Sequence, residues 1–248
     1  MVDVKSKVSQ EEWQARQDLA AFYRTVPYFN WDDLIFTHIS AKVPGTEDEF
    51  LINPYGFLFD EITASNLVKV DLKGKILSDT NNFINPAGFT IHSAIHEARE
   101  DAHCIVHLHS NDGVAVASLK DGLLPLSQTG MLVRSQISYH DYEGVALFDE
   151  EKERLVKDLG QEKLMILRNH GTLAIGKNVA EAFTNIYFLE KACSYQVRAM
   201  SGNLELNYPS DEAIETTKQQ GQGREMAAAL LWPAVKRKME SLDPSFMN

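Results

Sequence analysis

The amino-acid sequence predicts an α/β protein in which amphipathic helices alternate with short strands. Apolar residues recur three and four positions apart over residues 88–100 and 179–200, which is the spacing of a helix with one buried face. The apolar runs at 104–109 and 164–168 have the length of strands in a buried sheet. A chain of 248 residues is long enough to bury a substantial core, so we expect these segments to share one fold.

The first 80 residues predict one long helix followed by strand-rich sequence. Prolines and glycines mark the turns between the strands. The elements expected here are a helix over 11–25 that ends before Pro27, a short helix from Asp32, strands at 36–43 and 50–52 around Pro44-Gly45, a strand-like stretch at 57–59, and a hairpin of 68–70 with 75–77.

The later sequence predicts longer helices around two buried strands. The elements expected here are a helix over 88–100, a strand at 104–109, a short helix over 111–119, a loop at 139–144, a strand at 164–168 that turns at 169–171 and returns through 172–175, and a helix over 179–200. After Gly202, prolines and glycines interrupt helix-prone sequence. We therefore expect one domain over 1–202 and a helical C-terminal extension over 203–248, packed on that domain or on a neighbouring subunit.

The composition excludes some classes of partner. A net charge of −11 argues against binding to nucleic acid or to an anionic membrane, because both need clustered Lys and Arg. The sequence has no apolar run near the ~20 residues of a membrane span, and residues 1–10 lack the apolar stretch of a signal peptide. Cys104 and Cys193 lie in apolar segments and are expected to be core residues, not a disulfide. We expect a cytoplasmic protein with no nucleic-acid or membrane partner.

Three histidines are the candidate metal ligands. His107 and His109 are two residues apart on an expected strand, so their side chains point to the same face. His170 lies at the tip of a second strand, and imidazole suits Zn, Fe, Mn or Co. The spacing alone leaves a second interpretation open, in which these are hydrogen-bonded structural histidines. His92 and His96, one helical turn apart, are better explained by packing than by chelation.

Several motifs resemble the class II aldolase/adducin family. They are the sequences at 87–96, 104–109, 122–127, 139–144 and 167–171. The match is closest to the adducin head-like branch, which shares His-Asp-Tyr-x-Gly and Leu-Arg-Asn-His-Gly, and it extends over about 13–202. The resemblance implies a three-layer α/β/α sandwich around a central, mostly antiparallel sheet, assembled as a homotetramer. It also implies a divalent metal ion on His107, His109 and His170, with Zn first and Mn, Fe or Co as alternatives.

The sequence departs from the family's aldolases at the substrate site. The resemblance places Gly88 where those enzymes have a glutamate that serves as fourth ligand and acid/base. At the positions that hold the substrate phosphate in those enzymes, the resemblance places Pro86, Ala87, Tyr55 and His38. Losing a phosphate cradle removes charge-assisted hydrogen bonds, so we expect a substrate without phosphate.

Three hypotheses for function follow from the resemblance. The first is a metal-dependent lyase that performs retro-aldol cleavage or decarboxylation, through an enolate on the metal, of a small carbonyl or carboxylate compound. The second is a non-catalytic, adducin-like scaffold or binding protein. The sequence after residue 202 argues against this second hypothesis, because it does not resemble adducin's Lys-rich tail. The third is an epimerase or dehydratase that uses the same metal site.

The missing acid/base has candidates in the polar sequence at 139–144. Tyr139, Tyr142 and Glu143 are the candidate catalytic residues, although Asp-Tyr-Glu-Gly is also a good turn sequence. His92, one turn beyond Gly88, is a further candidate to lean into the space of the missing glutamate.

Overall fold

The computed structural model describes residues 4–144, 149–202, 204–221 and 225–248. Within these residues seven strands form one sheet of order β3-β2-β1-β4-β7-β6-β5. Its strands are β1 (His38–Lys42), β2 (Glu49–Ile52), β3 (Val68–Asp71), β4 (Cys104–Leu108), β5 (Ile137–His140), β6 (Leu164–Leu167) and β7 (Gly171–Gly176). Neighbouring strands pair antiparallel except β5 and β6, which are parallel. The sheet is therefore mostly antiparallel, as expected.

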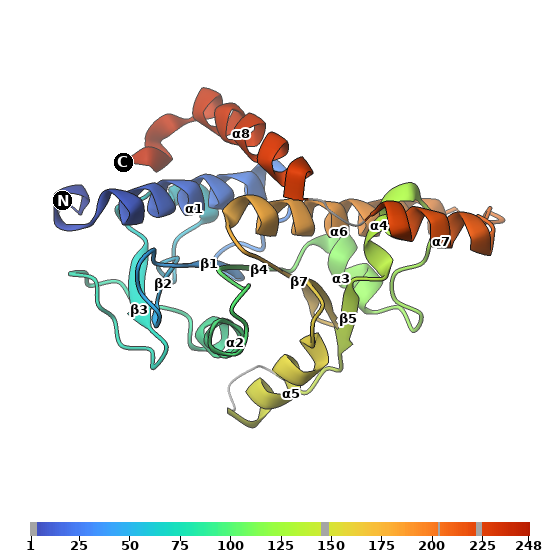
Figure 1. Ribbon diagram of the computed structural model, residues 1–248, viewed down its shortest axis with the longest axis horizontal. Helices are drawn as coiled ribbons and strands as arrows, with labels where there is room; N and C mark the ends of the chain where they lie inside the picture. Colours follow the sequence, from blue (N-terminus) through green and yellow to red (C-terminus); the bar gives the residue numbers. More distant parts are fainter. Residues whose placement is uncertain (1–3, 145–148, 203, 222–224) are drawn as a thin grey trace.

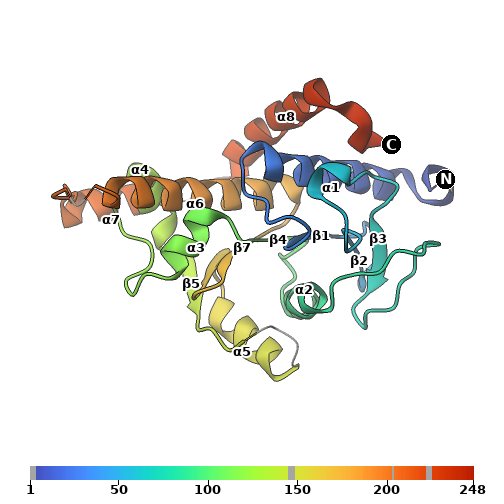
Figure 2. The ribbon, with the colours of Figure 1, turned by 180° about the vertical axis from the view of Figure 1, so that it is seen from behind.

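Helices cover both faces of this sheet. They are α1 (Gln10–Tyr28), α2 (Pro86–Ala98), α3 (Asn111–Ala117), α4 (Gln128–Arg134), α5 (Asp149–Leu159), α6 (Val179–Met200), α7 (Asp211–Gln220) and α8 (Glu225–Leu242), with 3-10 turns at Lys5–Lys7, Phe59–Glu61 and Pro244–Met247. Figure 1 shows α1, α6 and α8 on one side of the sheet and α2 and α5 on the other. The view from behind in Figure 2 shows the same two layers. The three-layer α/β/α sandwich is confirmed.

The alternation of side chains along β4 explains the layers. Cys104, Val106 and Leu108 pack into the main core with residues of α1 and α6. Ile105 points the other way, into a second core under α2 and α5. His107 shares the face of Ile105, so its imidazole enters the layer of α2 and not the main core.

The first helix and the segment after it differ from the prediction. Helix α1 continues through Pro27 to Tyr28, and the N–H of Phe29 still bonds to the Thr25 carbonyl, so the proline removes only one bond of the last turn. No helix begins at Asp32 in this described stretch. Asn30, Leu34 and Thr37 have positive φ angles, which a right-handed helix does not allow.

Other differences lie in short elements. The stretch at 57–59 is not a strand, because Phe59 begins a 3-10 turn and packs edge-on against Tyr23. The hairpin after β3 is confirmed by the bridge between Val70 and Ile76. The prediction missed α4 and α5. It also assigned residues 139–144 to a loop, although the first two of them are the end of β5.

The C-terminal helix packs on the same core as the rest of the chain. Trp232 of α8 contacts Phe22 of α1 and Phe183 of α6, with ring centroids 6.1 and 5.4 Å apart. Phe246 is fully buried nearby. Cys193 of α6 is buried and, like Cys104, forms no disulfide, as expected. Among the described residues, no helix combines the length and the apolar character that crossing a membrane requires.

Candidate metal centre

The structure brings His107, His109 and His170 together. One nitrogen from each ring lies within 4.8 Å of one from each of the others. The Nε2 atoms of His107 and His109 are 3.0 Å apart. Each pair of the three rings has its centroids 4.7 Å apart. His107 lies on β4, His109 directly follows that strand, and His170 comes from the turn between β6 and β7.

The local sequence of that turn places His170. Asn169 has a φ of 57°, a left-handed conformation that Asn tolerates better than most residues. A Cβ at Gly171 would lie 2.2 Å from the Leu108 carbonyl oxygen, so only glycine lets β7 approach β4 this closely. The Asn-His-Gly turn therefore folds His170 over the end of β4.

Hydrogen bonds orient the two β4 histidines. The Nδ1–H of His107 donates to the Thr172 carbonyl at 3.0 Å, and the Nδ1–H of His109 donates to the Asp33 carboxylate at 3.0 Å. A carbonyl and a carboxylate can only accept, so in the neutral rings both Nε2 atoms carry lone pairs. The sequence did not indicate Asp33 or Thr172 as partners, because neither lies next to a histidine in the chain.

This donor set fits a divalent metal ion. Burial holds the pKa of His107 well below its usual range and lowers the pKa of His170 to about 4, so both rings are neutral near pH 7. Two lone pairs facing each other repel unless a cation lies between them. Nitrogens about 2.1 Å from one ion, separated by roughly 90–110°, lie about 3.0–3.4 Å apart, which matches the His107–His109 distance.

A buried carboxyl lies behind these histidines. Glu190 of α6 accepts hydrogen bonds from the hydroxyls of Ser110 and Thr172. Burial is the dominant effect on this group and raises the pKa of Glu190 to about 7. Because Ser110 follows His109 and the Thr172 carbonyl holds His107, Glu190 supports the backbone on which two of the histidines are mounted.

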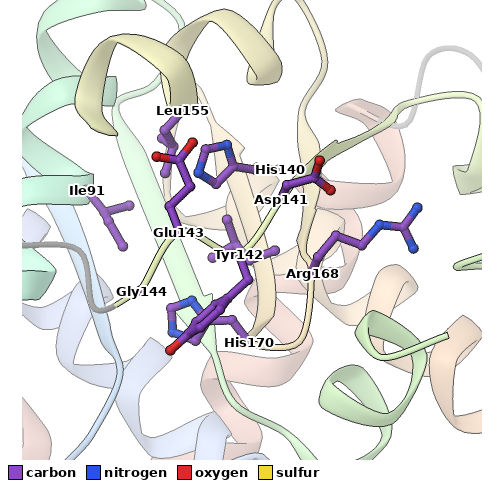
Figure 3. A pocket seen from close by; sticks show the side chains of 10 residues that line it. Ile91, His140, Asp141, Tyr142, Glu143, Gly144, Leu155, Arg168 and His170 are labelled. Atoms are coloured by element: carbon purple, nitrogen blue, oxygen red, sulfur yellow. The ribbon is translucent and has the colours of Figure 1, made fainter. Parts of the chain in front are cut away.

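Two of the candidate catalytic residues lie beside His170. Tyr142 and Glu143 line a small hollow that also includes His170 (Figure 3). The Tyr142 ring is 6.5 Å from the His170 ring, measured between centroids. The Arg154 guanidinium donates to Glu143 at 2.8 and 2.9 Å and holds the pKa of Glu143 below its usual range. Glu143 is therefore a carboxylate near pH 7.

Tyr139, the third candidate, is not in this group. It precedes His140 on β5 and packs against the main core, on the face of the sheet opposite the histidines. Its hydroxyl accepts a hydrogen bond from the Leu123 N–H at 3.1 Å, and the Arg168 guanidinium lies 4.2 Å from its ring centroid. These contacts give Tyr139 a packing role, so the geometry does not support the catalytic assignment.

His140 belongs to the same hollow; the sequence placed it in the polar cluster at 139–144 but did not single it out. It is buried, and its Nδ1–H donates to the Asp158 carboxylate at 2.7 Å. Asp158 lies on α5, eighteen residues away in the chain. Neighbouring side chains on a strand point to opposite faces, so β5 directs Tyr139 and His140 to different sides of the sheet. The sequence did not predict this difference, because the segment was expected to be a loop.

His38, and not His92, fills the space beside Gly88. A Cβ built on Gly88 would lie 1.9 Å from Cδ2 and 2.2 Å from Nε2 of the His38 ring. His92 stands behind His38, with its Nε2 atom 2.9 Å from the His38 Nδ1. The hypothesis that His92 leans into this space is therefore wrong.

The fold and this cluster together define the class of protein, a three-layer α/β/α sandwich with three histidines gathered at the ends of its central strands. The domain described as Class II Aldolase and Adducin N-terminal domain matches residues 17–197, which is more than half of the chain. The chain belongs to the class II aldolase and adducin family. The expected resemblance is confirmed.

Individual relatives agree with this assignment. A Caulobacter vibrioides protein, provisionally named as a class 2 aldolase, is 56% identical over 249 residues, which cover 100% of this chain and 97% of that protein. Alpha-adducin of Rattus norvegicus is 48% identical over 189 residues, which cover 75% of this chain and 26% of adducin. The crystal structure of an aldolase II superfamily protein from Pseudomonas syringae has a TM-score of 0.95 and 47% sequence identity, with 99% of each chain covered.

Proposed function

We propose that this chain is a metal-dependent enzyme of the lyase type, which performs retro-aldol cleavage or decarboxylation of a small, non-phosphorylated carbonyl or carboxylate compound. The observation that carries the proposal is the pair of Nε2 atoms of His107 and His109, 3.0 Å apart. Both rings donate their Nδ1 proton elsewhere, so both lone pairs are available to one ion. His170 supplies the third nitrogen of the set.

The residues of the site have distinct tasks in this proposal. A divalent ion held by the three histidines, with Zn first and Mn, Fe or Co as alternatives, would polarise a carbonyl and stabilise negative charge that develops on its oxygen. Thr172 and Asp33 keep His107 and His109 in the tautomer that offers Nε2. Of the candidate acid/base residues, the half-exposed Tyr142 can donate a hydrogen bond from its hydroxyl to a substrate in the hollow, whereas the ion pair with Arg154 and the lowered pKa make Glu143 a weak base.

The charge of the hollow favours a substrate without phosphate. Asp141 and Glu143 both line it and would repel a phosphate dianion. Arg168 also lines it, but its guanidinium donates to the Leu119 carbonyl at 2.8 Å and stacks on Tyr139. Figure 3 shows the Arg168 side chain directed away from Tyr142 and His170. The Arg168 side chain is thus engaged away from the site.

We also propose a homo-oligomer, with a tetramer as the favoured form, and a cytoplasmic location. Membership in the class II aldolase and adducin family supports an oligomer that acts on a small molecule. The masses obtained by light scattering of the purified protein distinguish a monomer from a tetramer.

Two alternatives remain as competing proposals. The 48% identity to alpha-adducin favours a scaffold or binding protein that keeps the fold without catalysis. An epimerase or dehydratase would use the same three histidines and would be separated from a lyase by its products.

The test is elemental analysis of gently purified protein by mass spectrometry, with His107→Ala and a matched control. The control is His103→Ala, because His103 is exposed and lies four residues earlier in the chain. We expect about one Zn, Mn, Fe or Co per chain in the unmodified protein and in His103→Ala, and loss of that ion in His107→Ala. The result against the proposal is protein that holds no metal even after reconstitution, which would favour the scaffold.

A further inference from the structure

A chain of buried hydrogen bonds leads from the α2 layer to the metal centre. The Nδ1 of His96 is 2.7 Å from the Ala102 carbonyl oxygen, and its Nε2 is 2.7 Å from Ser40 Oγ. Ser40 Oγ is also 2.6 Å from the Nδ1 of His92, whose Nε2 is 2.9 Å from the Nδ1 of His38. All four side chains are buried. We call this series, from His96 through Ser40 and His92 to His38, the histidine–serine chain.

The Ala102 carbonyl sets the direction of every bond in the chain. A carbonyl only accepts, so His96 carries its proton on Nδ1 and offers a lone pair at Nε2. Ser40 then donates its single proton to His96, and its oxygen accepts from the Nδ1–H of His92. The lone pair of His92 at Nε2 in turn accepts from the Nδ1–H of His38. This order leaves Nε2 of His38 without a proton.

This order of bonds needs three neutral imidazoles, and burial favours the neutral form. Burial lowers the pKa of His96 to about 3 and holds the pKa of His92 well below its usual range. For His38, the condition follows from its bond to the neutral His92 ring, which accepts the Nδ1 proton at Nε2. A second proton on any ring would remove an acceptor that the chain uses.

The unprotonated edge of His38 lies next to the candidate ligands. His38 on β1 is directly opposite His107 on β4 in the antiparallel register, and the ring centroids are 5.3 Å apart. The Cδ2–Nε2 edge lies over Gly88, where the absence of a side chain leaves room for the ring. The geometry thus puts a fixed hydrogen-bond acceptor beside the metal centre.

We propose that His38 is a further active-site residue, whose Nε2 lone pair accepts a hydrogen bond from a hydroxyl of the substrate bound at the metal centre, and that Ser40, His92 and His96 are positioning residues that hold this tautomer. The inference rests on the proposed metal site and names its ligand class as a small α-hydroxy carboxylate or α-hydroxy carbonyl compound. Such a compound offers the metal two oxygens, and its hydroxyl proton is the group that His38 recognises.

The tautomer itself is measured first, by long-range ¹H–¹⁵N correlation spectra of protein labelled with ¹⁵N-histidine, both metal-free and loaded with Zn. His38→Asn assigns the His38 signals. We expect a protonated Nδ1 and an unprotonated Nε2 in His38, and a mixture of both tautomers in Ser40→Ala, which interrupts the chain. A protonated Nε2 in the unmodified protein would overturn the inference.

Ligand recognition is measured next, on protein loaded with Co(II), by optical titration with glycolate and with methoxyacetate. The two probes present similar oxygens, but only glycolate has a hydroxyl proton. We expect a preference of about tenfold for glycolate, the size that one hydrogen bond supplies. His38→Asn keeps an amide where Nδ1 was, able to donate to His92, but has no atom where Nε2 was, so the preference should disappear while Co(II) is retained.

Two controls separate the possible failures. His38→Gln keeps an acceptor near the position of Nε2 and should retain part of the preference for glycolate. An equal preference in the unmodified protein and in His38→Asn would overturn the role of His38 and leave the metal site standing. Failure of the unmodified protein to bind Co(II) or Zn would instead overturn the proposed function, and this inference with it.

Discussion

Replacing Gly88 by alanine is the most direct test of the packing around His38. Gly88 lies in the first turn of α2, where alanine is intrinsically better than glycine by about 1 kcal/mol. Helix propensity alone therefore predicts a more stable protein. The structure predicts the opposite, because the added Cβ would lie 1.9 Å from Cδ2 of the buried His38 ring.

The size of the effect follows from how the ring is held. Ordinary carbon contacts begin near 3.4 Å, so the ring and the helix must separate by roughly 1.5 Å. Overpacking of this kind costs about 1–3 kcal/mol, and displacing His38 from His92 leaves a buried nitrogen without its partner, at about 1–3 kcal/mol more. After the gain in helix propensity is subtracted, Gly88→Ala should lower the free energy of unfolding by about 3 kcal/mol.

The assay is urea unfolding followed by circular dichroism, for Gly88→Ala alone and in a His38→Ala background. For a chain of this size, about 3 kcal/mol corresponds to a fall in Tm of roughly 10 °C. With the His38 ring removed, the same change should stabilise the protein by up to about 1 kcal/mol. The reversal of sign between backgrounds isolates the contact. An equal effect of Gly88→Ala in both backgrounds would refute the reasoning.

Two further predictions concern the groups that support the metal ligands. Asp33→Asn should weaken Zn binding by roughly 10–100-fold in a chelator competition, because it alters the acceptor that orients His109. The control Asp32→Asn, at an exposed position, should leave the Zn affinity unchanged, and equal affinities of the two variants would contradict the role of Asp33. Glu190, whose pKa is raised to about 7, contributes stability that is fully present below about pH 4.5 and lost as the pH rises through 7. Between pH 5 and pH 8 the free energy of unfolding should therefore fall by about 2–3 kcal/mol less in Glu190→Gln than in the unmodified protein. Glu181→Gln, nine residues earlier on α6, is the control and should keep the full difference. An unchanged difference in Glu190→Gln would refute the linkage.

The sequence predicted the parts of the fold that have a regular period. The helices α2 and α6 and the buried strands β4 and β6 follow from apolar spacing, because each has one face or both faces in the core. The segment after α1 was missed for a local reason. Leu34 and Thr37 take positive φ angles, which residues of these types rarely adopt and which only the tertiary context stabilises, so the sequence does not predict them.

The candidate site was predicted where its members share one strand or one motif. His107 and His109 are two residues apart, so strand geometry alone places them together. The partners that make the site suitable for a metal are distant in sequence: Asp33 is 76 residues from His109, and Thr172 is 65 residues from His107. No periodicity links such positions, so the tautomers of the ligands could be inferred only from the hydrogen bonds of the structure.

The two departures at Gly88 and His38 are one structural feature. Along the chain they look like independent departures from the pattern that the resemblance to the family's aldolases implies. In space the two positions are coupled: any side chain at position 88 would overlap the His38 ring, so this histidine conformation requires a glycine there. A site that had simply lost its carboxylate would leave a void there. This chain instead places in that space an imidazole that is hydrogen-bonded at Nδ1 and has its unprotonated edge beside His107. Maintaining four buried polar groups for that purpose is costly unless they serve the site. This favours a rebuilt active centre over the retired one that a scaffold would carry.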